Sequence, residues 1–340
     1  MTIGTDIGRQ RRRLSGDGAL EVALTAAFAV FTLVVSAAYG LPFALPGAES
    51  ASAVGLHYLY PLIGVAIWAL LVAFHGKQPL GATFLLALPC YGLILICHFN
   101  LKLWIVHLNP ALWDSAYWRI DQTLLPLVEG AKAMRLALAP VIPLGSNFYM
   151  FGFIAMFYLA FAWHALQSRA IFRELIVSAM LLQILGSLAY LVAPALGPFL
   201  YEPGVEPPVS GAQAYMLEAW HANRDGGAAW LRDHGSGSLT VGLAAMPSLH
   251  AGGSFLFVIF AWRHARPLLA VMLPLFAYIL VAAVATRWHY VVDLPVGIAL
   301  AWCAAALARR LLRAETARAG AVAEQPSPIP VPPGLPAPAE

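Results

Sequence analysis

Apolar segments long enough to cross a lipid bilayer recur along this chain and limit its fold more than any other feature. Only 11% of the 340 residues are charged and 60% are apolar, whereas about one-quarter of a soluble domain is charged. Runs of about 20 apolar residues, the length that a membrane helix needs, predict eight spans. These spans cover residues 19–41, 56–74, 80–101, 147–166, 173–196, 248–262, 268–286 and 289–308. The expected fold is therefore all-α, a polytopic bundle of transmembrane helices.

The positions of the basic residues predict the orientation of this bundle. The first apolar run follows four arginines between residues 9 and 13. It is longer than the apolar part of a signal peptide, about 7–15 residues, so we expect a first membrane helix. Eight spans place both termini on one side. With that side cytoplasmic, thirteen of the twenty Lys and Arg residues lie in inside segments, as the positive-inside rule requires. The predicted location is the inner (plasma) membrane.

The segments outside the spans differ in composition. Residues 1–18 form a basic tail on the cytoplasmic side. In residues 102–146, Trp and Tyr alternate with charges and prolines, a pattern that predicts short helices at the membrane interface. Residues 197–246 are rich in Gly, Pro and polar residues and are predicted to be an outer loop that covers a site. The Pro/Ala-rich residues 315–340 are predicted to be a disordered cytoplasmic tail.

Two short segments carry residues suited to catalysis, and the predicted topology puts both at the outer face. One contains His250 near the start of the sixth span, and the other contains His289 and Asp293 between the last two spans. His289 and Asp293 are four residues apart, a spacing that places them on one face of a helix. A carboxylate that binds one ring nitrogen leaves the other as a nucleophile, as a phosphohistidine intermediate requires. His250 is then the expected general acid and base.

The same segments also offer groups for a phosphate. Pro247 suits the first turn of a helix, and Ser248 follows it. Free N–H groups at such a helix start bind anions. Lys102 and Arg287 are cations on the outer side at a similar depth, so either can balance charge on the phosphate oxygens. Ser248, Lys102 and Arg287 are the expected phosphate-binding residues.

Other interpretations of these residues remain open. His289 and Asp293 also suit a buried structural pair, and with His250 they suit a metal site. Asp293 argues for function, because an acidic residue inside an apolar span costs about 2.5–3.5 kcal/mol. The three cysteines have no zinc-like spacing, and no HExxH pattern occurs. We therefore expect neither a metal nor another cofactor. Lys102 also fits a cation that extends from a helix end to the interface.

The motifs PSLH at 247–250 and HYVVD at 289–293 resemble the second and third signature motifs of the type 2 phosphatidic acid phosphatase superfamily. Within it, they resemble the inositol phosphorylceramide synthase-like branch of inositol phosphotransferases, where a leucine also replaces the glycine of the usual PSGH. The resemblance implies that His289 is the nucleophile, His250 the acid and base, and Asp293 the carboxylate that orients His289. It also implies a catalytic core of six helices in residues 79–314, with two additional helices in residues 19–78.

The chain departs from the hydrolase pattern of this superfamily at two arginines. The first family motif is Lys, six residues and Arg-Pro, whereas Lys102 is followed at that distance by Asn109. The hydrolase arginine lies six residues before the nucleophile, but Ala283 occupies that place and Arg287 lies only two residues before His289. These departures favour a transferase over a hydrolase.

A third stretch, NPALWDSAYWRID, resembles a segment of bacterial members of the same branch. This resemblance implies that Asp114 and Asp121 bind a lipid headgroup, although solvation at the interface suits them equally well.

The main hypothesis is a lipid phosphoester phosphotransferase that moves a phospho-headgroup, of the inositol phosphate type, to a lipid hydroxyl through a phosphohistidine. The expected partners are a phospholipid or lipid phosphate donor and a lipid alcohol or water as acceptor, with no nucleic acid. If water is the acceptor, the protein is a lipid phosphate phosphatase. A transporter that uses the ionisable residues as a proton relay is the hypothesis of another class, but the two halves of the chain lack the symmetry it predicts. A scaffold with a degenerate site is the remaining possibility.

Overall fold

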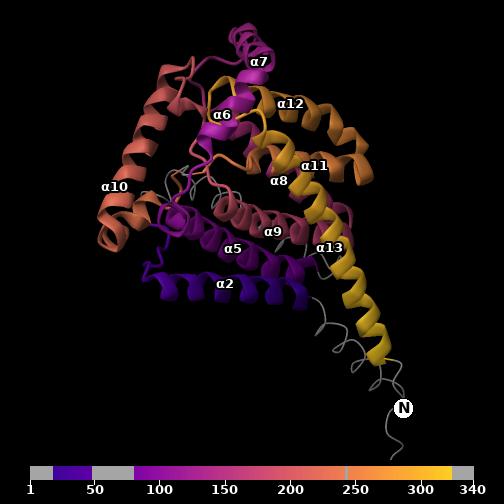
Figure 1. Cartoon of the computed structure of the whole chain (residues 1–340). Coiled ribbons are helices and arrows are strands. Elements are labelled where there is room, and N and C mark those ends of the chain that lie inside the picture. The colour runs from indigo at the N-terminus through magenta and orange to yellow at the C-terminus, as the bar shows by residue number, and fades with distance from the viewer. Residues whose placement is uncertain (1–17, 48–79, 242–243, 324–340) are drawn as a thin grey trace, which may run out of the picture.

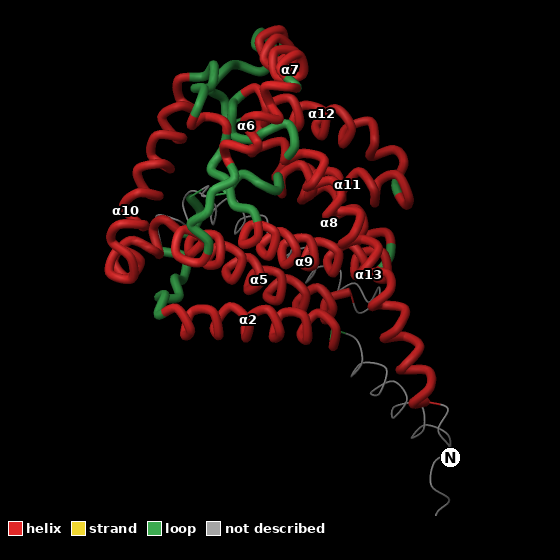
Figure 2. The backbone as a smooth tube through the Cα atoms, viewed as in Figure 1, coloured by secondary structure: helices red, strands yellow, loops and turns green. Residues whose placement is uncertain are grey.

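The structure is a computed structural model that describes residues 18–47, 80–241 and 244–323. All regular structure in these ranges is helical, and loops connect the helices (Figure 2). The helices are α2 (Ala19–Tyr39), α5 (Leu80–Leu108), α6 (Asp114–Thr123), α7 (Leu125–Ala137), α8 (Phe148–Gln167), α9 (Arg169–Val192), α10 (Pro207–Ser238), α11 (Leu249–His264), α12 (Leu269–Ala285) and α13 (Asp293–Ala323). Two short 3₁₀ turns, η2 (Pro198–Leu200) and η3 (Arg266–Leu268), lie between them. The predicted all-α class is confirmed.

Six of the described helices are long and apolar enough to cross a membrane, which supports a multi-pass membrane protein. They lie in α2, α5, α8, α9, α12 and α13. The predicted span at residues 248–262 corresponds to α11, which has only 16 residues. The predicted span at residues 56–74 lies outside the described residues. The structure therefore supports six spans, and the predicted total of eight remains a prediction.

Helix α9 lies at the centre of the bundle because its apolar residues cover most of its circumference. Its buried residues include the continuous run 175–182, a pattern typical of a helix that is surrounded by others. It packs against α5, α8, α11 and α13. Figure 1 shows α2, α5 and α9 side by side, while α6, α7 and part of α10 lie toward the other side of the molecule. Helix α13 extends from the region of α6 to the end of the bundle where α2 begins.

The segment predicted to be a loop, residues 197–246, is mostly helix. Helix α10 begins with Pro207 and Pro208, which suit the first turn of a helix, and it bends at Gly227, where φ is 55°. The Asn223 side chain on α10 donates to the Leu103 carbonyl of α5 at 2.8 Å. Glycine and proline thus mark a helix start and a bend here, and the prediction of a loop was wrong for residues 207–238.

The predicted boundary of the disordered tail is also displaced, because α13 continues through residue 315 to Ala323. Glu315 on this helix pairs with Arg173 of α9 at 2.7 Å and accepts the backbone N–H of Leu20 at 3.2 Å. These contacts attach the end of α13 to α2 and α9. Residues 324–340 lie outside the described residues.

The predicted end of the third span, at residue 101, is displaced as well. Helix α5 continues to Leu108, so Lys102 lies within this helix and not in the segment after it.

Candidate active site

The two motif segments meet where α11 and α13 begin. The backbone N–H of Ser248 donates to the carbonyl of Asp293 at 3.1 Å, which joins the start of one helix to the start of the other. Behind this bond the helix backbones touch at two glycines. A Cβ atom on Gly252 would lie 2.6 Å from the carbonyl oxygen of Gly297, and one on Gly297 would lie 2.1 Å from that of Ser248. Only glycine permits such an approach, so these residues set the spacing between His250 and His289.

His289 lies in the turn between α12 and α13, outside both apolar spans. Its Nδ1 atom lies 3.2 Å from Oδ2 of Asp293, which also accepts the backbone N–H of Tyr290 at 2.9 Å. The backbone N–H of His289 donates to the Ala283 carbonyl at 3.1 Å. Burial lowers the pKa of His289, the charge of Lys102 adds to this, and the Ala245 carbonyl opposes it. The imidazole is therefore neutral, the form that carries a lone pair.

His250 lies in the first turn of α11 and is held by aromatic rings of α8. The ring of Tyr149 packs edge-on against it with a centroid distance of 5.1 Å, and the ring of Phe153 does so at 4.7 Å. These contacts restrict the imidazole without engaging its nitrogens. Both ring nitrogens of His250 are without a hydrogen bond among the described residues, so they are free to exchange protons with a ligand.

Both histidines line one cavity of about 480 Å³. Lys102 of α5 lines it too, with its Nζ atom 5.4 Å from the centroid of the Tyr190 ring. Lys102 forms no ion pair with any described residue. The lining also includes apolar side chains, among them Leu95, Phe99, Ile154 and Phe157, with a few polar groups such as His98 and Gln183 between them. The cavity thus combines ionisable groups with a largely apolar wall, as a lipid phosphate requires.

Arg287, expected to bind phosphate, does not line this cavity. Its side chain is 1% exposed, and Nη2 donates to Oδ2 of Asp121 at 3.2 Å. Its Nε atom lies 3.3 Å from Glu202, and the guanidinium lies over the ring of Trp118 at 5.6 Å. The φ angle of Arg287 is 61°, a left-handed value that is unfavourable for most residues. These contacts direct its charge into the protein, so the geometry does not support the expected phosphate contact.

Asp114 and Asp121 hold the loops around His289. Asp114 accepts hydrogen bonds from the backbone N–H groups of Leu196 and Gly197 and from the Tyr290 hydroxyl, at 2.8–3.1 Å. Asp121 accepts the backbone N–H of Val291 at 2.8 Å in addition to its bond from Arg287.

Burial raises the pKa of both carboxyl groups, and these donors act in the opposite direction. Neither Asp114 nor Asp121 lines the cavity, so the geometry supports a positioning role and not the expected headgroup contact.

Ser248 is fully buried, and its Oγ atom accepts the backbone N–H of Ala251 at 3.3 Å as the N-cap of α11. Of the three residues expected to bind phosphate, the structure therefore places only Lys102 in the cavity. Tyr149, Phe153 and Tyr190 could not be predicted as site residues, because aromatic residues are frequent in apolar spans. Glu202, in a loop far from Arg287 in sequence, was also missed.

The part of the chain that the structure describes contains no cluster of three or more His, Cys, Asp or Glu side chains arranged to hold a metal ion. The groups at the motif end of the cavity are the imidazoles of His250 and His289, with Asp293 hydrogen-bonded to His289, and the ammonium group of Lys102. Such a set can form and break a bond to phosphorus by nucleophilic attack and proton transfer.

A family model described as the PAP2 superfamily matches residues 118–307, more than half of the chain. The chain belongs to the PAP2 superfamily. The match includes His250, His289 and Asp293 and ends before α13 does. It confirms the superfamily that the PSLH and HYVVD motifs predicted, and PAP2 membership agrees with a membrane enzyme of the lipid phosphatase and phosphotransferase class. The inositol phosphorylceramide synthase-like branch remains a prediction. No curated protein and no solved structure matches the chain.

Proposed function

We propose that this PAP2 protein is a phosphotransferase that moves a phospho-headgroup, of the inositol phosphate type, from a phospholipid to a lipid hydroxyl. The observation that carries the proposal is the cavity that His289, His250 and the unpaired Lys102 share with apolar side chains such as Phe99, Ile154 and Phe157. A phospholipid fits this combination, with its phosphate at the histidines and its acyl chains along the apolar side chains.

The proposed reaction has two steps. In the first, Nε2 of His289 attacks phosphorus, the bond from phosphorus to the diacylglycerol oxygen breaks, and protonated His250 gives its proton to that oxygen. The phospho-headgroup is then bound to His289, and Asp293 stabilises the positive imidazole. In the second step, the acceptor hydroxyl gives its proton to His250 and its oxygen attacks phosphorus, which releases His289. Water as the acceptor gives hydrolysis by the same path.

The charge of the cavity supports a phosphodiester donor. Arg135 also lines the cavity, but its Nε atom pairs with Glu206 at 2.8 Å, and its two terminal nitrogens each donate to a carbonyl, of Ile142 and of Pro143. Lys102 is then the one cation of the described lining without a carboxylate partner. A phosphomonoester carries about −1.5 to −2 charges at pH 7, whereas a diester carries one. One unpaired ammonium group matches the diester.

The test is a headgroup-transfer assay on purified protein in vesicles with EDTA present. Phosphatidylinositol and phosphatidate are offered as donors, with labelled ceramide or diacylglycerol as acceptors. We expect labelled phospho-headgroup lipid from phosphatidylinositol, little phosphate release from phosphatidate, and no product with His289→Ala. Faster phosphate release from phosphatidate would overturn the transferase in favour of a phosphatase. Equal activity of the His289→Ala variant would overturn the nucleophile.

A further inference from the structure

A second cavity lies at the end of the bundle opposite the histidines. It has a volume of about 490 Å³ and lies between the start of α9 and the end of α13. Glu174 of α9 and Arg309 of α13 are each sixteen residues from the histidine end of their helices, at Tyr190 and Asp293. At about 1.5 Å per residue, this places Glu174 and Arg309 roughly 24 Å from the histidine ends of their helices. The PAP2 chemistry does not use this second cavity.

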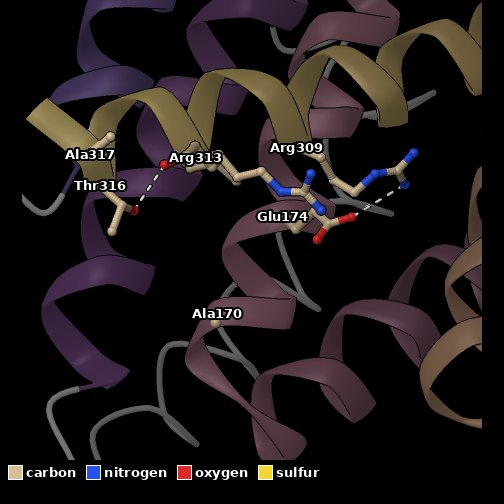
Figure 3. A pocket seen from close by; sticks show the side chains of 7 residues that line it. Ala170, Glu174, Arg309, Arg313, Thr316 and Ala317 are labelled. Carbon is tan, nitrogen blue, oxygen red and sulfur yellow. Dashed lines mark hydrogen bonds and ion pairs between the residues drawn. The ribbon is translucent and has the colours of Figure 1, made fainter.

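The polar lining of this cavity has more positive than negative charge. Arg309 and Arg313 extend from α13 beside Glu174 (Figure 3). Nη1 of Arg309 lies 3.6 Å from Oε1 of Glu174, and Nη1 of Arg263 lies 3.8 Å from the same oxygen. Three guanidinium groups thus lie near one carboxylate, and Arg313 has no ion-pair partner among the described residues.

The hydrogen bonding of this group is incomplete. Neither 3.6 Å nor 3.8 Å is a hydrogen-bond distance. Oε1 of Glu174 and the Nη1 atoms of Arg263 and Arg309 are buried and have no hydrogen-bond partner among the described residues. Buried charged groups are normally bonded, and the one nearby carboxylate oxygen cannot satisfy both arginines, so a donor of Arg309 has capacity for a further anionic oxygen, beside the exposed guanidinium of Arg313.

The remaining lining is apolar or small: Ala170, Leu312 and Ala317, with the hydroxyl of Thr316 beside them. Cations next to apolar side chains at the end of membrane helices match the border between lipid headgroups and acyl chains. Basic pockets between membrane helices bind anionic headgroups in this way. A soluble phosphate would use only the charges and leave the apolar wall without a partner.

We propose that the cavity formed by Glu174, Arg309 and Arg313 binds the phosphate group of an anionic phospholipid, at a site separate from the histidine cavity. The guanidinium groups of Arg309 and Arg313 bind the phosphate oxygens, and Leu312 packs against the glycerol and upper acyl region. Glu174 limits the affinity by its negative charge. This site does not depend on the proposed transferase activity.

The test compares lipid retention by native mass spectrometry of the full chain after exchange into phosphatidylglycerol or phosphatidylcholine. The variant is the double substitution Arg309→Gln with Arg313→Gln. The control is Arg310→Gln with Arg318→Gln, which removes the same charge from exposed positions of the same helix. We expect the variant to lose phosphatidylglycerol affinity roughly tenfold, and the control to lose much less. Lipid in the histidine cavity is common to both variants and does not affect their difference.

Glu174→Gln provides a test in the opposite direction and does not remove a cation. We expect this variant to bind phosphatidylglycerol more tightly than the wild type, because a competing negative charge is gone. Equal losses in variant and control, or no gain with Glu174→Gln, would overturn the site. Inorganic phosphate that displaces phosphatidylglycerol at equal concentration would overturn its assignment to a lipid.

Discussion

Asp121 and Arg287 form a buried ion pair that joins α6 to the loop carrying the proposed nucleophile. Nη2 of Arg287 lies 3.2 Å from Oδ2 of Asp121, and each side chain is 1% exposed. The other carboxylate oxygen of Asp121 accepts the N–H of Val291, two residues after His289. A pair at this place fixes the loop on both sides of His289, so its effect on catalysis is indirect.

Asp121→Asn should therefore slow catalysis and destabilise the protein together. Removing one partner of a buried pair costs about 3–5 kcal/mol, because the other charge stays buried. We expect a lower thermal unfolding midpoint and a fall in kcat, with KM for the phospholipid little changed. The matched control is Asp225→Asn, which breaks an exposed pair with Arg224 and should change neither quantity. A rise in KM with unchanged kcat would instead show that Asp121 binds the headgroup.

Asp293→Asn tests the orientation of the nucleophile. The carboxylate of Asp293 lies 3.2 Å from Nδ1 of His289. An amide of the same shape can hold the wrong tautomer, and such a change lowers kcat by about 10⁴-fold in triads of this type. We expect a loss of this order with a small change in KM. Trapping of a labelled phosphohistidine should fail in the variant, and wild-type levels of trapped enzyme would contradict the role of Asp293.

Lys102→Met tests the one unpaired cation of the histidine cavity. Methionine keeps much of the side-chain volume but cannot balance charge on phosphorus oxygens, so we expect kcat/KM to fall by roughly 10²-fold. Lys132→Met is the control, because its ammonium group is bound by Glu129 and Glu202 and does not line the cavity. A similar loss in both variants would indicate a general effect of charge and count against phosphate binding by Lys102.

The parts of the fold that follow from local composition were predictable from the sequence. Most of α9 and all of α12 consist of predominantly apolar residues, and only a helix satisfies its own backbone in a bilayer. Residues 207–238 were mistaken for a loop because their glycines and polar residues weaken a local helix signal, while the bond from Asn223 to α5 depends on tertiary structure. The contact of Glu315 also depends on tertiary structure, because its partner Arg173 is far away in the sequence. The continuation of α13 beyond residue 315 could therefore not be predicted from local composition.

The candidate site likewise contains residues that local spacing predicts and residues whose roles depend on tertiary contacts. His289 and Asp293 were predictable as a pair because a spacing of four residues is local information. The roles of Arg287, Asp114 and Asp121 were not predictable, because a charged residue near a motif looks the same whether it faces a ligand or another loop. In the structure these side chains are buried and bind partners more than 80 residues away in sequence, which shows that they face other loops.

Gly297→Ala tests whether the contact between α11 and α13 sets the spacing of the histidines. The added Cβ atom would lie 2.1 Å from the Ser248 carbonyl oxygen, a backbone atom at the N-cap of the helix that carries His250. The helices must then move apart, so we expect a lower unfolding midpoint and a loss of transferase activity. Gly211→Ala is the control, because a Cβ atom there meets nothing within 4 Å on α10, and alanine in an open helix position is favourable by about 0.5–1 kcal/mol. A Gly297→Ala protein with normal stability and activity would show that the two motif segments tolerate a wider spacing than this contact implies.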